Sequence, residues 1–367
     1  MQSILEISTA AESTLGPFDD SALNKQLSSL EGTLSTLDSP TSLSLSSMPQ
    51  SNRELSKLLR VKSSSTLTYA SKNKSEHYKL LKIPKKGGHR VVYNPSDLMR
   101  LLQFRILKEV LEKYFEIPDY IYAFERDKSI PVMARVHEGS LQIVSLDIEN
   151  YFPSIKQHVL KDLMLSVGFG ESPARTLSEL MTLGPNVPQG GLTSPKISNI
   201  VASRTFGPEV KKYCDDRGLA LTIYADDITI SSKESFDSKE AIDYVSGVLT
   251  RYGFRVNRGK TKVMKKGTRH SRLYVCGTVV NEKVNLLKEE RLRLRAIVHN
   301  AGKNGLEAEA AKTNLTPNEF MLRIRGKLNW FGQLNPTGSS RLISSFQRAC
   351  TEWEEICRST PYQHQPE

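Results

Sequence analysis

The chain has 367 residues with 51 Lys or Arg and 40 Asp or Glu, so its formal net charge is +11. This length allows two or three subdomains around one cleft, and the positive balance favours a polyanionic partner without defining an activity. No apolar run reaches about 18 residues and no basic, then apolar, leader is present, so we expect a cytoplasmic protein without a membrane span. The cysteines lack zinc-type spacing and are expected to be free thiols: Cys214, Cys276, Cys350 and Cys357.

Residues 1–50 differ in composition from the rest of the chain. They contain 12 serines, six acidic residues and one lysine, which leaves 50 basic and 34 acidic residues, a net charge of +16, in residues 51–367. Leucines between positions 23 and 37 have helical spacing, which allows a short amphipathic helix. We therefore expect a Ser/Leu-rich N-terminal extension, disordered or docked through that helix, in front of a basic body.

The body alternates predicted hairpins with predicted helices. Helical spacing occurs in six segments: 53–62, 96–114, 157–167, 172–182, 194–216 and 238–252. Strand patterns predict three hairpins: 80–93 with Gly87-Gly88 at its tip, 221–230, and 273–280 with 284–286. From Leu287 onward the pattern favours basic helices over a continued sheet, with Gly302 as a stop signal.

Two adjacent carboxylates, Asp226 and Asp227, lie within the apolar and β-branched segment 221–230. Strand alternation places them at the tip of a hairpin. Like charges this close raise each other's pKa and cost stability unless a cation neutralises them. A turn formed by an Asp-Asp pair is the ordinary alternative for this segment taken alone, so the rest of the chain must decide.

A third carboxylate, Asp147, ends an apolar strand that begins at Gln142 and is followed by Phe152. Three carboxylates from two neighbouring strands can hold two Mg²⁺ ions, because a hard cation prefers oxygen ligands. A pair of such ions clamps the attacking and leaving oxygens of phosphoryl transfer. These acids therefore predict nucleotidyl transfer.

In this order the motifs resemble those of reverse transcriptases. The residues that carry the resemblance are Tyr224-Ala-Asp-Asp227, Asp147 with Phe152, Val187-Pro-Gln-Gly-Gly-Leu-Thr-Ser-Pro195 between them, and Ile83-Pro-Lys-Lys-Gly-Gly-His-Arg90 with Asn94-Pro95. The resemblance covers roughly residues 75–340 and implies an α+β right-hand polymerase with fingers, a palm built on an antiparallel sheet, and a helical thumb. It implies fingers over 51–145, a palm over 146–286 with finger helices inserted at about 157–216, and a thumb with a C-terminal tail over 287–367.

Within that family the chain looks most like the bacterial retron reverse transcriptases. Those proteins tend to carry Asn-Ala-x-x-His before the first acid and Val-Thr-Gly after the Asp-Asp hairpin. This chain has Met133-Ala-Arg-Val-His137 and Val275-Cys-Gly277, so that Met replaces Asn and Cys replaces Thr.

The resemblance implies a catalytic role for each acid. Asp147 and Asp226 would bridge two Mg²⁺ ions, the Ile148 carbonyl would complete one shell, and Asp227 would bind less directly. Lys260 would protonate the pyrophosphate leaving group, with Lys262 as the second choice. A surface lysine is the ordinary alternative for either position.

The resemblance also implies contacts to the incoming nucleotide. Arg90 and one of Lys85 or Lys86 would bind phosphate oxygens, for which the planar fork of arginine is suited. Phe152 would exclude a 2′-hydroxyl, and Gln189 would contact nucleotide and template. The ordinary alternatives are a charged hairpin edge, core packing for the aromatic ring, and a loop glutamine.

A retron-type protein would use a structured non-coding RNA as template and primer, dNTPs as substrates, and the 2′-hydroxyl of an internal guanosine as the start point. Its product would be an RNA–DNA hybrid and a branched single-stranded DNA, often in phage defence beside a separate effector protein. Shape and backbone contacts would recognise the RNA. The expected RNA-binding residues are His137, Val275, Cys276, Gly277, Arg291, Arg295, Arg323 and Arg325. His137 could equally be a packed helix residue.

Two other readings stay open. The altered Met133 and Cys276 leave room for a reverse transcriptase of another bacterial group, of the abortive-infection or group II intron type. An inactive RNA-binding scaffold is the alternative from a different class. Clustered acids argue against a scaffold, because without a metal they bring no stability.

Overall fold

The structure is a computed structural model that describes residues 48–85, 88–267 and 272–359. Most of the predicted N-terminal extension, including the leucines at 23–37, lies outside the described residues, as does Lys86. The prediction of free thiols is confirmed for Cys214, Cys276 and Cys350. The side chain of Cys357 is not among those described.

The described chain forms two compact units, each assembled from separate segments. The first unit contains residues 48–128, 146–228 and 237–261. The second contains residues 129–145, 229–236 and 262–359. Strands β3 (Gln142–Asp147) and β5 (Asp227–Ser232) each run from one unit into the other.

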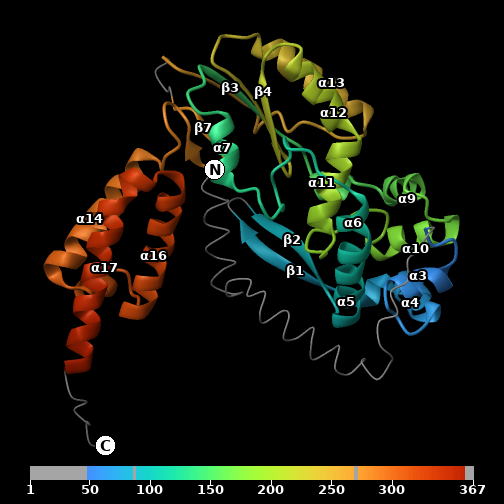
Figure 1. Ribbon diagram of the computed structural model, residues 1–367, viewed down its shortest axis with the longest axis horizontal. Helices are drawn as coiled ribbons and strands as arrows, with labels where there is room; N and C mark the ends of the chain where they lie inside the picture. Colours follow the sequence, from blue (N-terminus) through green and yellow to red (C-terminus); the bar gives the residue numbers. More distant parts are fainter. Residues whose placement is uncertain (1–47, 86–87, 268–271, 360–367) are drawn as a thin grey trace, which may run out of the picture. The chain divides into compact units, whose positions relative to one another are not determined.

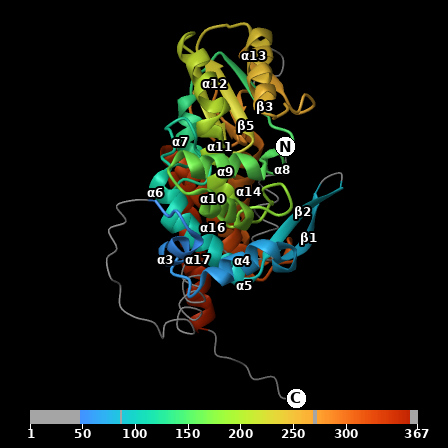
Figure 2. The ribbon, with the colours of Figure 1, turned by 90° about the vertical axis from the view of Figure 1, so that its right-hand side faces the viewer.

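The first unit is rich in helices (Figure 1). Its helical segments are α3 (Asn52–Leu58), α4 (Ser64–Lys72), the 3₁₀ turn η1 (Lys74–His77), α5 (Asp97–Ile106), the π-helical turn η2 (Leu107–Leu111), α6 (Glu112–Tyr114), α8 (Tyr151–Ser154), α9 (Gln157–Ser166), α10 (Glu171–Leu180), α11 (Ser194–Arg204), α12 (Phe206–Asp215) and α13 (Ser238–Arg251). Helices α9 and α10 pack side by side, as Figure 2 shows. Polar side chains cap several N-termini, such as Ser96 on α5 and Asp237 on α13.

One helix predicted over 194–216 is in fact two, which corrects the sequence expectation. The chain leaves helical geometry at Thr205, where φ is −122° and ψ is −104°. Pro208 follows in the first turn of α12, and a proline in the interior of a single helix would remove a hydrogen bond and clash with the preceding turn. Gly207 also fits closely, because a Cβ there would lie 2.5 Å from the Ala202 carbonyl oxygen.

The predicted hairpin over 80–93 is confirmed as β1 (Tyr78–Lys85) and β2 (Gly88–Pro95), which pair antiparallel with Lys85 opposite Gly88. A four-stranded sheet has the order β4-β5-β3-β6, with β4 at Ala220–Tyr224 and β6 at Lys262–Lys265. Strand β3 pairs antiparallel with β6, and all but one of its residues are buried. The sheet therefore brings the strand that ends at Asp147 next to the strand that begins at Asp227.

The second unit ends in a helical bundle. Its helices are α7 (Ile130–Val136), α14 (Lys288–Asn304), α15 (Leu306–Ala311), α16 (Pro317–Leu334) and α17 (Pro336–Ser359). Helices α14, α16 and α17 pack around buried Val298, Phe320 and Phe346 (Figure 1). The preference for helix after Leu287 is confirmed, but α14 continues past Gly302 and ends at Asn304. The next residue is Gly305, whose φ of 87° suits a residue without a side chain.

The third predicted hairpin is tighter than expected. Strands β7 (Tyr274–Val275) and β8 (Thr278–Val279) turn at Cys276-Gly277, and both turn residues have positive φ. Two positive φ values fit a two-residue hairpin turn, whose twist matches that of the strands. Val279 also bridges antiparallel to Asn285, so the expected pairing of 273–280 with 284–286 is confirmed at this position, and the β7–β8 turn is an additional feature. Helices and antiparallel strands together confirm the α+β class.

Candidate active site

The ends of two adjacent strands bring Asp147 and Asp226 together in the first unit. The backbone N–H of Ile148 donates to the Asp226 carbonyl oxygen at 2.8 Å. The Asp147 carbonyl oxygen accepts from the Asn257 N–H at 2.7 Å, which fixes the chain on the other side. The carboxylates of these two residues therefore come from neighbouring points on one sheet edge.

The turn that presents Asp226 is tight and strained. Strand β4 ends at Tyr224 and β5 begins at Asp227, so only Ala225 and Asp226 connect them. Ala225 has φ of 53°, which is uncommon for a residue with a side chain, and is 8% exposed. A small residue at this position keeps the cost of the left-handed geometry low while Asp226 stays at the turn.

Burial and charge act on Asp226 in the same direction. Burial, and then the negative charge of Asp147, raise the pKa of the Asp226 carboxyl above its ordinary value. Lys260 and Arg90 oppose that rise. The influence of Arg90 matters because this residue lies on β2, so the β1–β2 hairpin contributes positive charge to the acidic site.

Lys260 lies directly on Asp147. Its Nζ is 3.0 Å from one carboxylate oxygen and 2.9 Å from the other. The Lys260 side chain is 62% exposed, whereas that of Asp147 is 12% exposed. The Lys260 ammonium thus neutralises the buried Asp147 carboxylate.

The donors at this site fit a divalent metal by their chemistry, because carboxylates and a backbone carbonyl are the ligands that hard cations prefer. Within the described residues, however, no three His, Cys, Asp or Glu side chains form a ready-made metal site. Asp147 and Asp226 are electrostatically coupled, and the ammonium of Lys260 shares the Asp147 carboxylate. Metal binding would require that ammonium to move.

An aromatic cluster around the buried Tyr151 lies next to the site in sequence, a few residues after Asp147. The Tyr151 hydroxyl donates to the Ser198 carbonyl oxygen at 2.6 Å, and burial together with the charge of Asp226 raises the pKa of Tyr151. The ring of Tyr151 lies 5.5 Å from that of Phe254 and 6.0 Å from that of Phe152. Phe152 is half-buried.

Gln189 lies on a loop that packs tightly on the β1–β2 hairpin. Its carbonyl oxygen accepts from the Tyr93 N–H at 2.7 Å. A Cβ at Gly190 would meet the Tyr93 carbonyl oxygen at 2.5 Å, so only glycine permits this approach. Lys85 and Arg90 on the same hairpin are exposed. The contact between Tyr93 and Gln189 therefore joins the hairpin that carries Lys85 and Arg90 to the loop that carries Gln189.

Gln103 was missed by the sequence analysis, although it organises this loop. It is 0% exposed, and its Nε2 donates to the Tyr78 hydroxyl at 2.6 Å and to the Leu180 carbonyl oxygen at 2.9 Å. Its Oε1 accepts from the Leu192 N–H at 2.9 Å. One side chain thus joins the start of β1, the end of α10 and the Gln189 loop.

Two residues predicted to bind RNA are buried in the second unit. His137 is 0% exposed, and its Nδ1 lies 2.7 Å from the Ser231 hydroxyl. Burial lowers the pKa of His137 to about 4, so its ring is neutral near pH 7. Val275 is 2% exposed. Direct RNA contact by either side chain does not fit this burial, whereas Cys276 and Gly277 at the hairpin turn are half-buried.

The predicted arginines of the bundle divide into two groups. Arg325 is half-buried and points toward α17, where it lies 3.7 Å from Glu354 and beside Cys350. Arg295 and Arg323 are exposed, and Arg291 is half-buried. On the same face as Arg323, burial and the charges of Arg323 and Arg293 lower the pKa of Lys327. Arg293 and Lys327 were not among the RNA-binding residues predicted from the sequence.

Comparison with known proteins gives the class. The family described as "Reverse transcriptase (RNA-dependent DNA polymerase)" matches residues 83–273, which is more than half of the chain. The chain therefore belongs to the reverse transcriptase family, whose polymerases use divalent metal ions, and the right-hand polymerase class predicted from the motifs is confirmed.

Curated relatives narrow the resemblance to retron proteins. The retron Mx65 reverse transcriptase of Myxococcus xanthus is 31% identical over 292 residues, which cover 72% of this chain and 63% of that protein. The retron Ec86 reverse transcriptase of Escherichia coli is 29% identical over 225 residues, which cover 60% of this chain and 69% of that protein. The chain thus spans less than two thirds of the Mx65 protein and resembles retron-type reverse transcriptases.

Among solved structures, the chain is similar to telomerase from Candida albicans in complex with a fragment of telomeric RNA. The match covers 85% of this chain and 69% of the telomerase chain, with 12% identity and a TM-score of 0.46. A search of the described helices finds none long and apolar enough to cross a membrane.

Proposed function

We propose that the protein is an RNA-directed DNA polymerase whose active site contains Asp147, Asp226 and Asp227. The observation that carries this proposal is the backbone hydrogen bond from Ile148 to Asp226, which joins the two acid-bearing strand ends at 2.8 Å. Burying two coupled acids costs stability, and a catalytic metal site explains why that cost is tolerated.

The residues of the site have distinct proposed tasks. Asp147, Asp226, Asp227 and the Ile148 carbonyl would hold two Mg²⁺ ions. Two ions, when bound there, would activate the primer hydroxyl and neutralise charge on the pyrophosphate. Lys260 is already in contact with Asp147 and would donate a proton to the leaving group once released.

Neighbouring residues would bind the nucleotide. Arg90, whose charge reaches Asp226, would hold phosphate oxygens together with Lys85 or Lys86. Phe152, which is half-buried, would lie against the sugar and exclude a 2′-hydroxyl. Gln189, fixed against Tyr93, would contact the base pair being formed.

Primer extension on an RNA template tests the proposal. Asp226→Asn keeps the shape of the side chain but removes its charge, so we expect incorporation to fall by about a hundred-fold or more. Asp216→Asn is the matched control, because Asp216 is exposed and forms an ion pair with Lys212 at 3.1 Å. Equal incorporation by wild type and Asp226→Asn would overturn the assignment.

We further propose that the template is a structured non-coding RNA that also primes synthesis and yields branched single-stranded DNA, in a phage-defence system with a separate effector. Similarity to the curated retron proteins supports this. Sequencing of the nucleic acid bound to the purified protein tests it. Branched DNA of one sequence is expected, whereas untemplated DNA would favour a reverse transcriptase of another bacterial class.

A further inference from the structure

A strained aromatic residue lies in the segment between α6 and α7. Phe124 has φ of 61° and is 52% exposed. A bulky side chain in left-handed geometry is a genuine outlier that costs free energy, and the surrounding structure must enforce it. The exposed ring gains little from burial, so packing of the ring itself does not account for this conformation.

Helix α11 enforces the conformation from both sides of Phe124. Asn199, which is 1% exposed, donates through Nδ2 to the Ala123 carbonyl oxygen at 2.5 Å and to Glu125 Oε1 at 2.9 Å. Lys196 Nζ lies 3.1 and 3.0 Å from the two carboxylate oxygens of Glu125. The Lys196 and Glu125 side chains are only 13% and 19% exposed, so their pairing carries a desolvation cost. The ring of Phe124 is therefore held out by a fixed polar frame.

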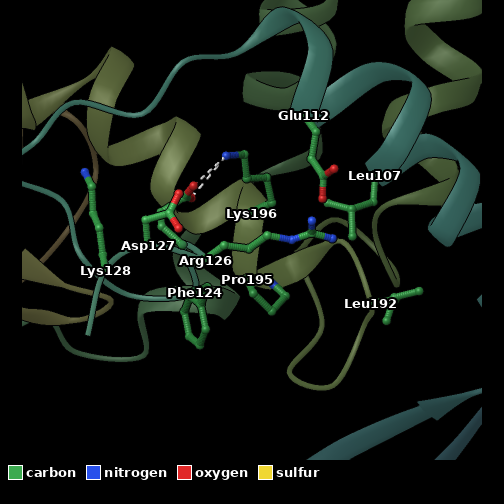
Figure 3. Close-up of a pocket in the computed structure, with 10 residues that line it drawn as sticks. Leu107, Glu112, Phe124, Arg126, Asp127, Lys128, Leu192, Pro195 and Lys196 are labelled. Atoms are coloured by element: carbon green, nitrogen blue, oxygen red, sulfur yellow. Dashed lines mark hydrogen bonds and ion pairs between the residues drawn. The ribbon is translucent and has the colours of Figure 1, made fainter. Parts of the chain in front are cut away.

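The ring borders a cavity of about 330 Å³, which Figure 3 shows in close-up. Pro195 and Leu192 supply apolar walls, and the guanidinium of Arg126 extends across the cavity toward Glu112 (Figure 3). Arg126 is exposed, and no ion pair within the described part of the chain involves it. The apolar ring of Phe124 and the planar guanidinium of Arg126 thus line the same cavity.

The position of the cavity connects it to the proposed active site. Leu192 belongs to the same loop as Gln189, and Gln103 anchors it through the Leu192 N–H. Leu192, which lines the cavity, is therefore only three residues from Gln189, the residue proposed to contact the template. Because the cavity and the proposed template contact share one loop, a substrate of that site can reach both.

We propose that this cavity binds one unpaired nucleotide of the RNA template, with its base stacked on Phe124 and with Arg126 contacting its phosphate or base edge. This inference rests on the proposed function. Single-stranded RNA is recognised by stacking splayed bases on aromatic rings or guanidinium planes. A run of phosphates fits less well, because acidic Glu112 and Asp127 also line the cavity and suit the amino groups of a base edge.

Binding of defined RNA, measured without Mg²⁺ or dNTPs, tests the site. A primer–template with a 5′ single-stranded template overhang, labelled with 2-aminopurine in the overhang, is compared with a blunt duplex. For wild type we expect the overhang to improve affinity at least about five-fold, as the lower end of base–aromatic stacking predicts, and to quench the probe. Phe124→Ala should lose both effects, and Phe124→Trp should keep them.

Control variants separate this site from general damage. Tyr69→Ala removes an aromatic ring that is equally exposed, at 52%, and should leave the overhang effect unchanged. Phe124→Gly should fold as well as wild type, because glycine accepts the left-handed backbone, yet should lose the quenching. Arg126→Gln should weaken overhang binding without altering thermal unfolding.

Two outcomes would overturn the inference: equal affinity of wild type for overhang and blunt duplexes, or quenching that persists in Phe124→Ala. Failure of the proposed function looks different. Asp226→Asn should bind the overhang as wild type does while failing to extend it. If wild type bound the overhang through Phe124 but never copied RNA, the nucleotide site would stand and the polymerase assignment would fall.

Discussion

The ammonium of Lys260 lies within 3.0 Å of both carboxylate oxygens of Asp147, although 113 positions separate the two residues in the sequence. Sequence analysis gave these residues separate tasks, one as a metal ligand and the other as a proton donor. The structure makes them partners. Because a carboxylate that binds an ammonium through both oxygens presents less charge to a metal, the two tasks compete in the absence of substrate.

Lys260→Met should therefore strengthen metal binding while it weakens catalysis. The Lys260 side chain is largely exposed, so the gain is modest, about two- to five-fold in affinity for Mn²⁺. Electron paramagnetic resonance titration of the free protein measures this without turnover. Lys212→Met, which removes an ammonium from exposed Asp216, is the matched control. Unchanged affinity in Lys260→Met would contradict the competition.

Gln103→Leu should destabilise the first unit and loosen the Gln189 loop. The substitution leaves the Leu192 N–H and the Leu180 carbonyl oxygen without their partner in a buried place, at a cost of about 3 kcal/mol. Tyr78→Phe removes only one bond of the same network and should cost about 1 kcal/mol. Urea denaturation measures both differences.

Hydrogen exchange at the Leu192 amide gives a second readout for Gln103. We expect faster exchange in Gln103→Leu and a higher KM for dNTPs with a smaller change in kcat, since the loop is misplaced while the acids are intact. If Gln103→Leu unfolds no more easily than Tyr78→Phe, the bonds to Leu192 and Leu180 contribute nothing measurable to stability.

Local patterns were sufficient to predict much of the fold. The hairpin around Lys85 and Gly88, the helices on either side of Gly184-Pro185, and the acid hairpin at Asp226 all follow from strand alternation, helical spacing and turn residues. The break at Thr205 also had a local signal, Gly207-Pro208, which was passed over. The prediction of one helix was therefore wrong although the residues that break the helix are adjacent in the sequence.

Other features could not be read locally, because they depend on partners far apart in the chain. The pair Lys196 and Glu125 spans 71 positions, and the bond from Gln103 to Leu180 spans 77. Arg323 and Arg325 look alike in sequence, yet helical geometry turns one outward and the other toward Glu354. The different surroundings of these two arginines come from tertiary packing, which hydrophobic periodicity and composition do not predict.

Stability of the second unit should depend on pH through His137. Burial lowers the folded-state pKa of this histidine to about 4, below the ordinary 6.5 of an unfolded chain. The unfolded state therefore binds the proton more tightly, so the contribution is complete above pH 6.5 and is lost as the pH falls from 6.5 toward 4. The loss amounts to about 3 kcal/mol.

His137→Asn should flatten this dependence, because asparagine can still pair with Ser231 but does not titrate in this range. Urea denaturation at pH 4.5 and pH 7.5, followed by a probe in the second unit, measures the difference. His158→Asn, at an exposed histidine, is the control. A His137→Asn variant with the same pH dependence as wild type would show that this histidine is not buried neutral in solution.

Substitutions of the bundle arginines should separate nucleic-acid binding from folding. Arg323 and Lys327 are four residues apart on α16, and the charges of Arg323 and Arg293 act on Lys327, so this face concentrates positive charge. If that face contacts RNA phosphates, Arg323→Gln should reduce the slope of log affinity against log salt by about 0.7–0.9 for structured RNA. Lys327→Gln should act in the same way.

Arg325→Gln is the internal control, since it removes the same charge two residues along the same helix. Arg325 lies near Glu354 and Cys350 of α17, so its loss should lower the free energy of unfolding by about 1 kcal/mol and leave the salt slope unchanged. Filter binding of RNA between low and moderate salt, together with denaturation, distinguishes the two. A reduced slope in Arg325→Gln with an unchanged slope in Arg323→Gln would reverse the assignment of the two faces of α16.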